Sequence, residues 1–136
     1  MSHYDKPIPV PDFDSAPFWE GCRQHKLLLQ RCAACGHLRF PPSGMCPHCR
    51  STQSDWIAAT GRGRLYSWIV IRHPIPREIY GNDVPYVVAL VDLEEGVRIP
   101  TNMDCAPDVL VGDMPVEVVF DDVTPDLTLP KFRPLR

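Results

Sequence analysis

Two C-x2-C motifs, separated by ten residues, constrain this chain more than any other feature. The stretch CAACGHLRFPPSGMCPHC holds Cys32, Cys35, Cys46 and Cys49. Each motif places two thiolates on one tight turn, and the loop between the turns can close four sulfurs into a tetrahedron around a metal ion. We expect zinc, with iron as the alternative for the same four-sulfur set.

A closed four-thiolate site leaves no position for substrate, so we interpret the metal as structural. Gly36 directly follows the first pair, where a metal-binding turn favours a positive φ, and Pro47 fixes φ at the start of the second turn. His37 and His48 are alternative ligands, but four cysteines suffice, so we place both histidines around the site. A thioredoxin-like redox motif is disfavoured because it carries one C-x2-C beside a βαβ pattern.

Composition and length fit a globular protein. With 136 residues, of which 44% are hydrophobic and 23% charged, the chain can bury one modest core and a small appended unit. No apolar run approaches the roughly 20 residues of a membrane span. The N-terminal stretch MSHYDKPIPVPDFD is acidic and proline-rich and lacks the pattern of a secretory signal, so we expect a cytoplasmic protein with reduced thiols.

The N-terminal half is expected to hold an arm, a helix and the metal unit. Residues 1–14 should form an extended arm, and DSAPFWEGCRQHK should form a short helix with Asp14 or Ser15 as its N-cap. KLLLQRC is typical of a strand that leads into the first metal turn. The first two units are therefore the arm and helix (1–25) and the zinc ribbon (26–54).

Residues 55–136 are expected to form a barrel. Short apolar segments rich in Val, Ile, Tyr and Trp are separated by turn residues, and LEEG favours a hairpin turn between two of them. Roughly five such strands without a long helix fit a small closed barrel of the OB-fold type. The fold class is therefore mostly β, with a short N-terminal helix, a zinc ribbon and a C-terminal five-stranded OB-fold barrel.

Catalytic groups are sparse in this sequence. Cys22 and His25 are the nearest nucleophile and base, three residues apart on the predicted helix, but nothing near them supplies an oxyanion hole. We interpret Cys22 as a small buried hydrophobe. Glu94 and Glu95 are adjacent in a turn and point apart, so we interpret them as solvated turn carboxylates rather than an acid/base pair. No catalytic residue is predicted.

Seven motifs, in this order, carry a resemblance to a known family: FWEG, LLLQRCAACG, MCPHC, GRGRLYSW, PYVVALVDLEEGVR, VGDMPVEVVF and LPKFRP. From about residue 17 to residue 134 the chain resembles the DUF35 family, acyl-CoA-associated proteins that pair a rubredoxin-like zinc ribbon with an OB-fold. The resemblance implies that the four cysteines hold zinc.

The same resemblance implies an accessory subunit whose partner carries the chemistry. Such partners are thiolase-superfamily acyltransferases, aldolases of the steroid side-chain type or MaoC-like enoyl-CoA hydratases. Because thiolase-type enzymes are usually dimeric, two copies of each chain are expected. The accessory subunit would dock near the CoA-thioester site and stabilise the enzyme.

Two groups of residues are candidate contacts. Phe18 and Trp19 share a helix face with Cys22; this face either packs on the body, which we favour, or forms an exposed aromatic anchor for the partner. The residues around the first barrel strand that suit CoA phosphates are Arg62, Arg64, Arg72, His73 and Arg77. They allow an alternative function as a stand-alone acyl-CoA-binding module, although alternate strand residues face opposite sides.

Nucleic-acid binding is a third possibility because zinc ribbons and OB-folds both serve it. The net charge of −3 and the pI near 5.9 disfavour a surface that neutralises phosphates.

Overall fold

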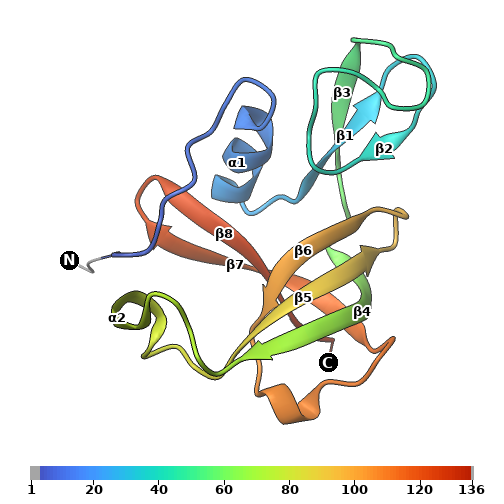
Figure 1. Cartoon of the computed structure of the whole chain (residues 1–136). Helices are drawn as coiled ribbons and strands as arrows, with labels where there is room; N and C mark the ends of the chain where they lie inside the picture. Colours follow the sequence, from blue (N-terminus) through green and yellow to red (C-terminus); the bar gives the residue numbers. More distant parts are fainter. Residues whose placement is uncertain (1–3, 136) are drawn as a thin grey trace.

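The computed structural model describes residues 4–135 and shows a small sheet and a helix above a barrel (Figure 1). The predicted fold class is confirmed. The elements in chain order are α1 (Ala16–Arg23), β1 (Leu28–Cys32), β2 (Leu38–Arg39), β3 (Ser54–Ala58), β4 (Arg62–Ile71), α2 (Arg77–Tyr80), β5 (Tyr86–Leu93), β6 (Arg98–Met103), the 3-10 turn η1 (Pro107–Val109), β7 (Pro115–Thr124) and β8 (Leu127–Pro134). Within the described residues, no helix is long and apolar enough to cross a membrane.

The ribbon is a three-stranded antiparallel sheet in the order β2-β1-β3. β3 pairs with β1 along its whole length, from Cys32 opposite Ser54 to Leu28 opposite Ala58. The ribbon sheet therefore extends to Ala58, past the boundary expected at residue 54, because the backbone groups of β1 find their second partner strand there.

The C-terminal part is a closed barrel in the order β4-β5-β6-β8-β7. The closure is local: β4 pairs with β7 only over Arg62–Arg64, and β6 meets β8 in parallel where Met103 lies opposite Phe132. The predicted LEEG turn joins β5 to β6, with Gly96 at a φ of +86° and its N–H donating to the Leu93 carbonyl at 2.9 Å. Only glycine adopts this φ without strain.

Alternation along the strands fills the barrel. In β5 every second side chain, Val87, Ala89, Val91 and Leu93, is buried. Phe132 of β8 joins them at the centre of a cluster that runs on without a break into the ribbon and α1. The molecule therefore has one shared core rather than one for each unit.

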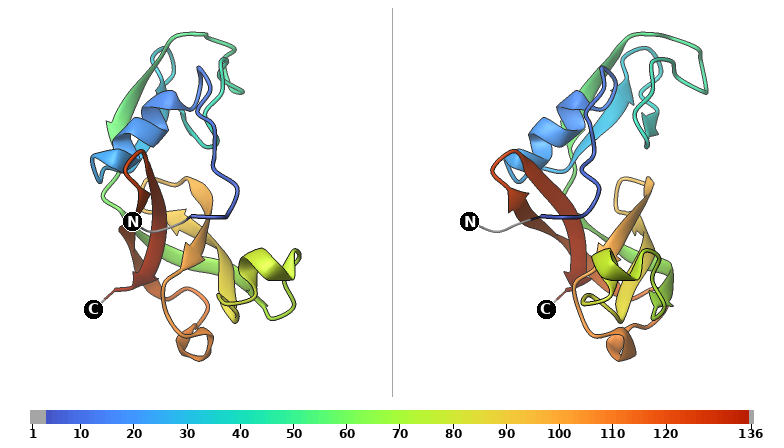
Figure 2. Two further views of the ribbon diagram at one scale, coloured as in Figure 1. Left: turned by 90° about the vertical axis from the view of Figure 1, so that its left-hand side faces the viewer. Right: turned by 60° about the vertical axis from the view of Figure 1, so that its left-hand side comes forward.

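Helix α1 contributes to that shared core. Phe18 is 5% exposed and Cys22 is fully buried, and the helix packs on β8 (Figure 2). The Phe18 ring contacts Trp19 and Phe40 edge-on, with centroids 5.2 and 5.4 Å apart. These contacts fit the packing alternative, and Phe18 offers no exposed anchor.

The start of α1 is held by residues that precede it. Ser15 is the N-cap, but its hydroxyl makes no cap hydrogen bond. Instead, the Asp12 N–H donates to the Ser15 hydroxyl at 3.1 Å, and the Ser15 N–H donates to the Asp12 carboxylate at 2.8 Å. This reciprocal pair fixes the direction in which the arm enters the helix.

Polar links join the N-terminal units to the barrel. His25 Nε2 lies 3.0 Å from Asp122 Oδ1, and the His25 ring stacks on Phe120. A hydrogen bond from the Thr128 hydroxyl is the main cause that holds the pKa of Asp122 below its usual range, and the hydrogen bond to His25 is the second. The link therefore anchors the end of α1 to β7.

Gly63 lies where β4 is sandwiched between β5 and β7, and a side chain there has no space. A Cβ at Gly63 would collide with the Asp92 carbonyl oxygen, which is backbone and cannot swing away. We expect Gly63→Ala to lower the free energy of unfolding by about 1–3 kcal/mol, the usual cost of overpacking. Gly112→Ala is the matched control, because nothing lies within 4 Å of its Cβ. Urea unfolding measures both; equal stabilities would contradict the close approach.

Candidate functional site

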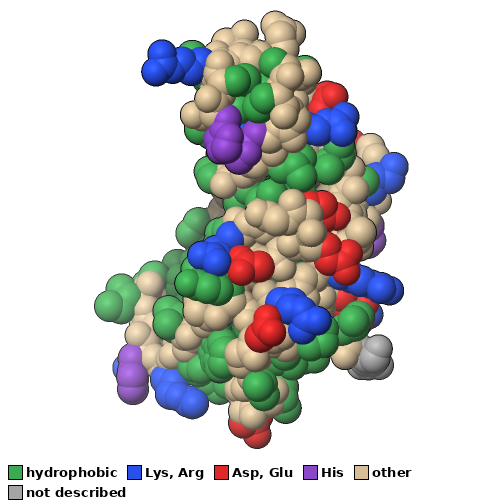
Figure 3. All heavy atoms as spheres, turned by 90° about the vertical axis from the view of Figure 1, so that its right-hand side faces the viewer, with side chains coloured by type: hydrophobic (Ala, Val, Ile, Leu, Met, Phe, Trp, Pro, Cys, Tyr) green, Lys and Arg blue, Asp and Glu red, His purple; other side chains and the backbone are tan. Residues whose placement is uncertain are grey.

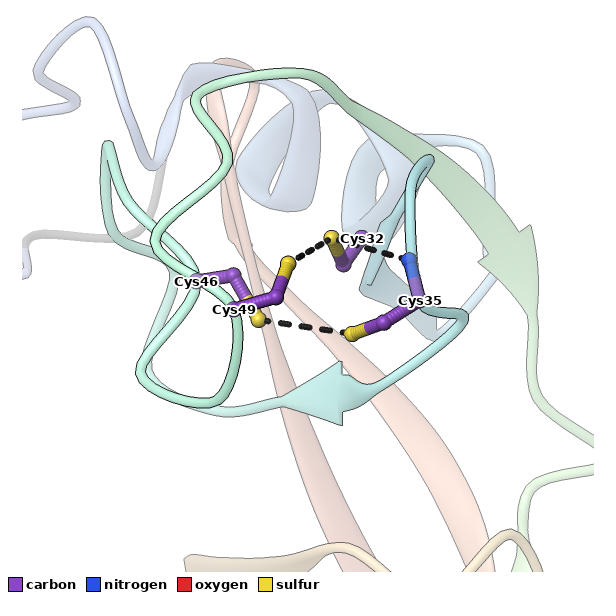
Figure 4. A group of neighbouring side chains, drawn as sticks. All are labelled: Cys32, Cys35, Cys46 and Cys49. Atoms are coloured by element: carbon purple, nitrogen blue, oxygen red, sulfur yellow. Dashed lines mark hydrogen bonds between the residues drawn. The ribbon is translucent and has the colours of Figure 1, made fainter.

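The four cysteines of the two motifs converge at one end of the ribbon (Figure 4). Their sulfurs all lie within 4.8 Å of one another, with Cys32 to Cys49 at 3.5 Å and Cys35 to Cys46 at 3.7 Å. A tetrahedral zinc ion with Zn–S bonds of about 2.3 Å requires sulfurs about 3.8 Å apart. The residues therefore fit a four-thiolate metal ion.

The two cysteine turns have equivalent backbones. The Gly36 N–H donates to the Cys32 carbonyl and the Arg50 N–H donates to the Cys46 carbonyl, both at 2.9 Å. Gly36 has a φ of +80°, as predicted, and Arg50 takes the same role with a φ of +66°. Each turn thus orients its pair of sulfurs toward the other turn.

Backbone N–H groups also face the sulfurs. The Cys35 N–H donates to Cys32 Sγ at 3.5 Å, and the His48 N–H donates to Cys46 Sγ at 3.4 Å. The first of these bonds is the main cause that lowers the pKa of Cys32 to about 6. A thiolate is the form of cysteine that binds a metal ion, and this bond favours it at Cys32.

The ribbon has little apolar core of its own. Within residues 28–58 the buried side chains are Leu29, Gln30, Cys32, Arg39 and Cys46. Two of these five are metal-ligand candidates and two are polar, so burial of hydrophobic surface contributes little to this unit. A metal ion held by the four cysteines would account for how the ribbon is held together.

Arg39 is a second sign of a charged centre. Its Nη2 donates to the Ser43 carbonyl at 2.9 Å, but Nε and Nη1 are buried with no hydrogen-bond partner among residues 4–135. A buried guanidinium without a carboxylate is costly unless negative charge lies in the same unit. Four thiolates around a divalent ion in the same ribbon would supply that negative charge.

His37 and His48 lie beside the cluster, one from each turn. Their rings stack with centroids 3.8 Å apart. The possible ligand group in the described chain consists of the four cysteines. The histidines therefore connect the two turns through their rings.

The cysteines outside the motifs lie elsewhere. Cys22 is fully buried, and burial raises its pKa to about 12. His25, its candidate base, bonds to Asp122 instead. Burial is the main cause that raises the pKa of Cys105, and the negative charge of Asp104 is the second. A protonated, enclosed thiol such as Cys22 is a poor nucleophile.

The adjacent glutamates of the hairpin turn hold the linker between the ribbon and the barrel. Glu94 accepts a hydrogen bond from the Thr60 hydroxyl and Glu95 accepts one from the Thr60 N–H, both at 2.9 Å. The interpretation of both as solvated turn carboxylates omits this structural role, which Thr60, remote in sequence, gives them.

The candidate CoA residues are spread out. Arg62 and Arg64 lie at the start of β4, whereas Arg72 and His73 follow its far end and Arg77 begins α2. A ten-residue strand spans about 30 Å, so the five side chains do not form one cluster. Arg64 also donates to the Asp113 carbonyl at 3.0 Å.

A hollow of about 850 Å³ lies between the arm, α2 and the barrel. Its lining includes the charged side chains Lys6, Lys131, Asp83, Asp104, Asp121 and Asp122. Both lysines are already paired with carboxylates, at 2.9 and 2.7 Å. The hollow is therefore rich in negative charge and disfavours an anionic ligand. Sequence patterns did not predict it because its walls come from four distant segments.

Comparison with known proteins places both units in one family. The model for the "ChsH2, rubredoxin-like zinc ribbon domain" matches residues 19–55, and the model for the "ChsH2, C-terminal OB-fold domain" matches residues 56–121. A solved chain titled "Ltp2-ChsH2(DUF35) aldolase" is 45% identical, has a TM-score of 0.85, and is matched over 93% of this chain and 98% of that chain.

Curated relatives show the same relationship over part of their length. The chain is 46% identical to a "Probable enoyl-CoA hydratase alpha subunit" of Thermomonospora curvata, over 95% of this chain but 40% of that protein. It is 32% identical to "Benzoylsuccinyl-CoA thiolase subunit BbsA" of Thauera aromatica, over 85% of this chain and 72% of that protein. The chain thus spans about two-fifths of the first of these relatives. With its cysteine ribbon, its five-stranded barrel and these matches, this chain belongs to the DUF35 family.

Proposed function

We propose that this chain is a non-catalytic accessory subunit of an acyl-CoA-processing complex. It docks to a thiolase-superfamily or hydratase-like catalytic subunit near the CoA-thioester site and stabilises it, with two copies of each chain in the assembly. One observation carries the proposal: this ribbon and barrel recur in proteins named for a hydratase, a thiolase and an aldolase. These reactions need different catalytic groups, so a unit common to all three supplies what they share.

The internal packing supports a docking role. The four-thiolate site is closed, the barrel is filled by Phe132 and its neighbours, and Cys22 is enclosed. A body held together in this way presents a fixed surface, which reduces the entropy that docking costs.

We further propose that the metal is zinc, held by Cys32, Cys35, Cys46 and Cys49. Zinc accepts four thiolates in a tetrahedron without redox chemistry, as a structural site requires. Iron in the same set is the alternative, and elemental analysis with an absorption spectrum separates the two.

The stand-alone acyl-CoA-binding alternative has less support. The arginines that would bind phosphates lie at opposite ends of β4, and the large hollow is lined by carboxylates. Calorimetry with an acyl-CoA tests it directly: micromolar affinity that is lost in Arg72→Ala/Arg77→Ala would revive it. Salt-dependent binding of single-stranded DNA or RNA would likewise revive the nucleic-acid-binding alternative.

Co-expression tests the proposed function. When the chain is produced with the thiolase-like or hydratase-like enzyme encoded by a neighbouring gene, we expect the two to elute together as one heteromeric complex. We expect turnover of the acyl-CoA substrate by the complex to exceed that of the catalytic subunit alone by about tenfold or more, since a misplaced active site loses activity on that scale. Turnover by this chain alone, or failure to associate with either enzyme, would contradict the proposal.

A further inference from the structure

We propose that the outer side of β4, together with the loop that follows it, is the surface that docks the catalytic subunit. This inference rests on the proposed function and adds the location of the contact. The barrel docking face consists of Tyr66, Ile69, Ile75 and Val88, all exposed. Figure 3 shows hydrophobic side chains at the surface of the barrel half of the molecule, beside oppositely charged side chains that lie in contact.

Strand register places apolar side chains on the outside of the barrel. Ile69 of β4 lies opposite Val88 of β5, and the next pair along, Val70 opposite Val87, has Val87 buried in the core. Because side chains alternate, Ile69 and Val88 face outward. An outer barrel face is normally polar, so this pair is unusual on a surface that faces water.

The same part of β4 has an open edge. β7 pairs with β4 only over Arg62–Arg64. Beyond this stretch, the backbone of Leu65 makes hydrogen bonds to the backbone of Asp113 and Met114. From Ser67 to Ile71 the described chain provides β5 alone as a ladder partner, and Tyr66 lies at the irregularity between the paired residues Leu65 and Ser67. Tyr66 and Ile69 are 54% and 59% exposed there, and an exposed apolar edge favours association with another chain.

The loop after β4 holds one apolar side chain out in solvent. In RHPIPR, Ile75 is 92% exposed and stands between Pro74 and Pro76. Each proline fixes its own φ, so the loop is stiff and little entropy is lost when Ile75 is immobilised. A stiff, protruding apolar residue is suited to be an interface anchor.

Charge around the face indicates the chemistry of the partner. Arg72, His73 and Arg77 are exposed and make no ion pair among residues 4–135, and Glu78 is the exposed carboxylate beside them. The unpaired charge bordering Ile75 is therefore mainly positive. We infer a partner surface with an apolar depression and a carboxylate-rich rim.

The charges at the Tyr66 end of the barrel docking face neutralise each other. Arg98 makes two hydrogen bonds to Asp92, at 2.6 and 3.1 Å, and its guanidinium lies 3.5 Å from the centroid of the Tyr66 ring. This stacked pair orders Tyr66 before binding. Tyrosine and arginine are enriched among the residues that dominate protein interfaces.

Two other occupants fit less well. A second copy of this chain, docked about a two-fold axis, would bring Arg72 and Arg77 toward their own copies, and like charges oppose that contact. Single-stranded nucleic acid needs aromatic side chains for stacking. Apart from Tyr66, the face is aliphatic.

Binding measurements with three variants test the inference. The probe is the purified catalytic subunit identified by co-expression, titrated with the full chain. We expect Ile75→Ser to raise Kd about tenfold or more, the effect of losing an anchor. We expect Arg72→Glu/Arg77→Glu to raise Kd about tenfold and to remove most of the salt dependence. Val10→Ser, on the N-terminal arm at 86% exposure, is the control and should change Kd by less than about twofold.

The outcomes separate this inference from the proposed function. If the wild-type chain binds neither candidate enzyme, the proposed function fails and the inference falls with it. If the wild-type chain binds but Ile75→Ser and the charge reversal bind equally well, the docking face is wrong and the accessory role stands. Sedimentation of the chain with phosphatidylserine vesicles, or concentration-dependent dimerisation, abolished by Ile75→Ser would instead assign the face to a lipid surface or a second copy and overturn the inference.

Discussion

Removal of the metal ion is expected to unfold the cysteine turns, β2 and β3 while the barrel keeps its structure. The ribbon buries few apolar side chains, and two of its five buried residues are cysteines of the cluster. Metal binding to small structural zinc units contributes about 10–16 kcal/mol at pH 7, far more than such a core supplies. Hydrogen exchange of the chelated protein should show lost protection around Trp56 and retained protection in β5.

Cysteine variants separate the metal effect from a general loss of thiols. Cys46→Ser removes a buried ligand and should reduce bound zinc from one ion per chain to a small fraction, with the same exchange pattern as chelation. Cys105→Ser is the control, because Cys105 lies outside the cluster. Full protection of β2 and β3 in metal-free protein would show that the ion is not what holds the ribbon.

Phe132→Ala is expected to lower the free energy of unfolding by about 3–5 kcal/mol, and Tm by roughly 10 °C or more. Phe132 is fully buried, and its carbonyl also accepts the Asp104 N–H. It lies at the junction of β6, β7 and β8, so truncation opens a cavity in the core that the barrel shares with α1.

The matched control is the same substitution on the surface. Phe13 is 96% exposed, so Phe13→Ala should alter stability by less than about 0.5 kcal/mol. Thermal unfolding followed by circular dichroism compares the two variants. If Phe132→Ala unfolded at the wild-type temperature, the shared core would not be the main source of stability.

The metal centre could be predicted because its information is local. Two residues separate the cysteines of each pair, and Gly36 follows in the conformation that the turn requires. The strand-forming residue types of the segment before LEEG likewise predicted β5, and the LEEG turn predicted the hairpin to β6, since both signals come from neighbouring residues. Arg50, which takes the place of Gly36 in the second turn, gave no signal because arginine rarely adopts a positive φ.

The spatial arrangement of the candidate binding residues could not be predicted from the sequence, for a physical reason. The five basic residues near β4 are close in sequence, but an extended strand carries its ends about 30 Å apart. The sequence leaves two alternatives for Phe18, because an apolar helix face indicates that it is covered but does not indicate which segment covers it. β8, far along the chain, supplies the cover.

By itself, the sequence determined the four-sulfur site, the ribbon and the strands, because spacing and periodicity act over a few neighbouring residues. Only the tertiary structure decided that helix, ribbon and barrel share one core, that carboxylates line the large hollow, and that β4 keeps an apolar open edge. These features depend on contacts between segments distant in the chain, and the local pattern leaves those contacts unspecified.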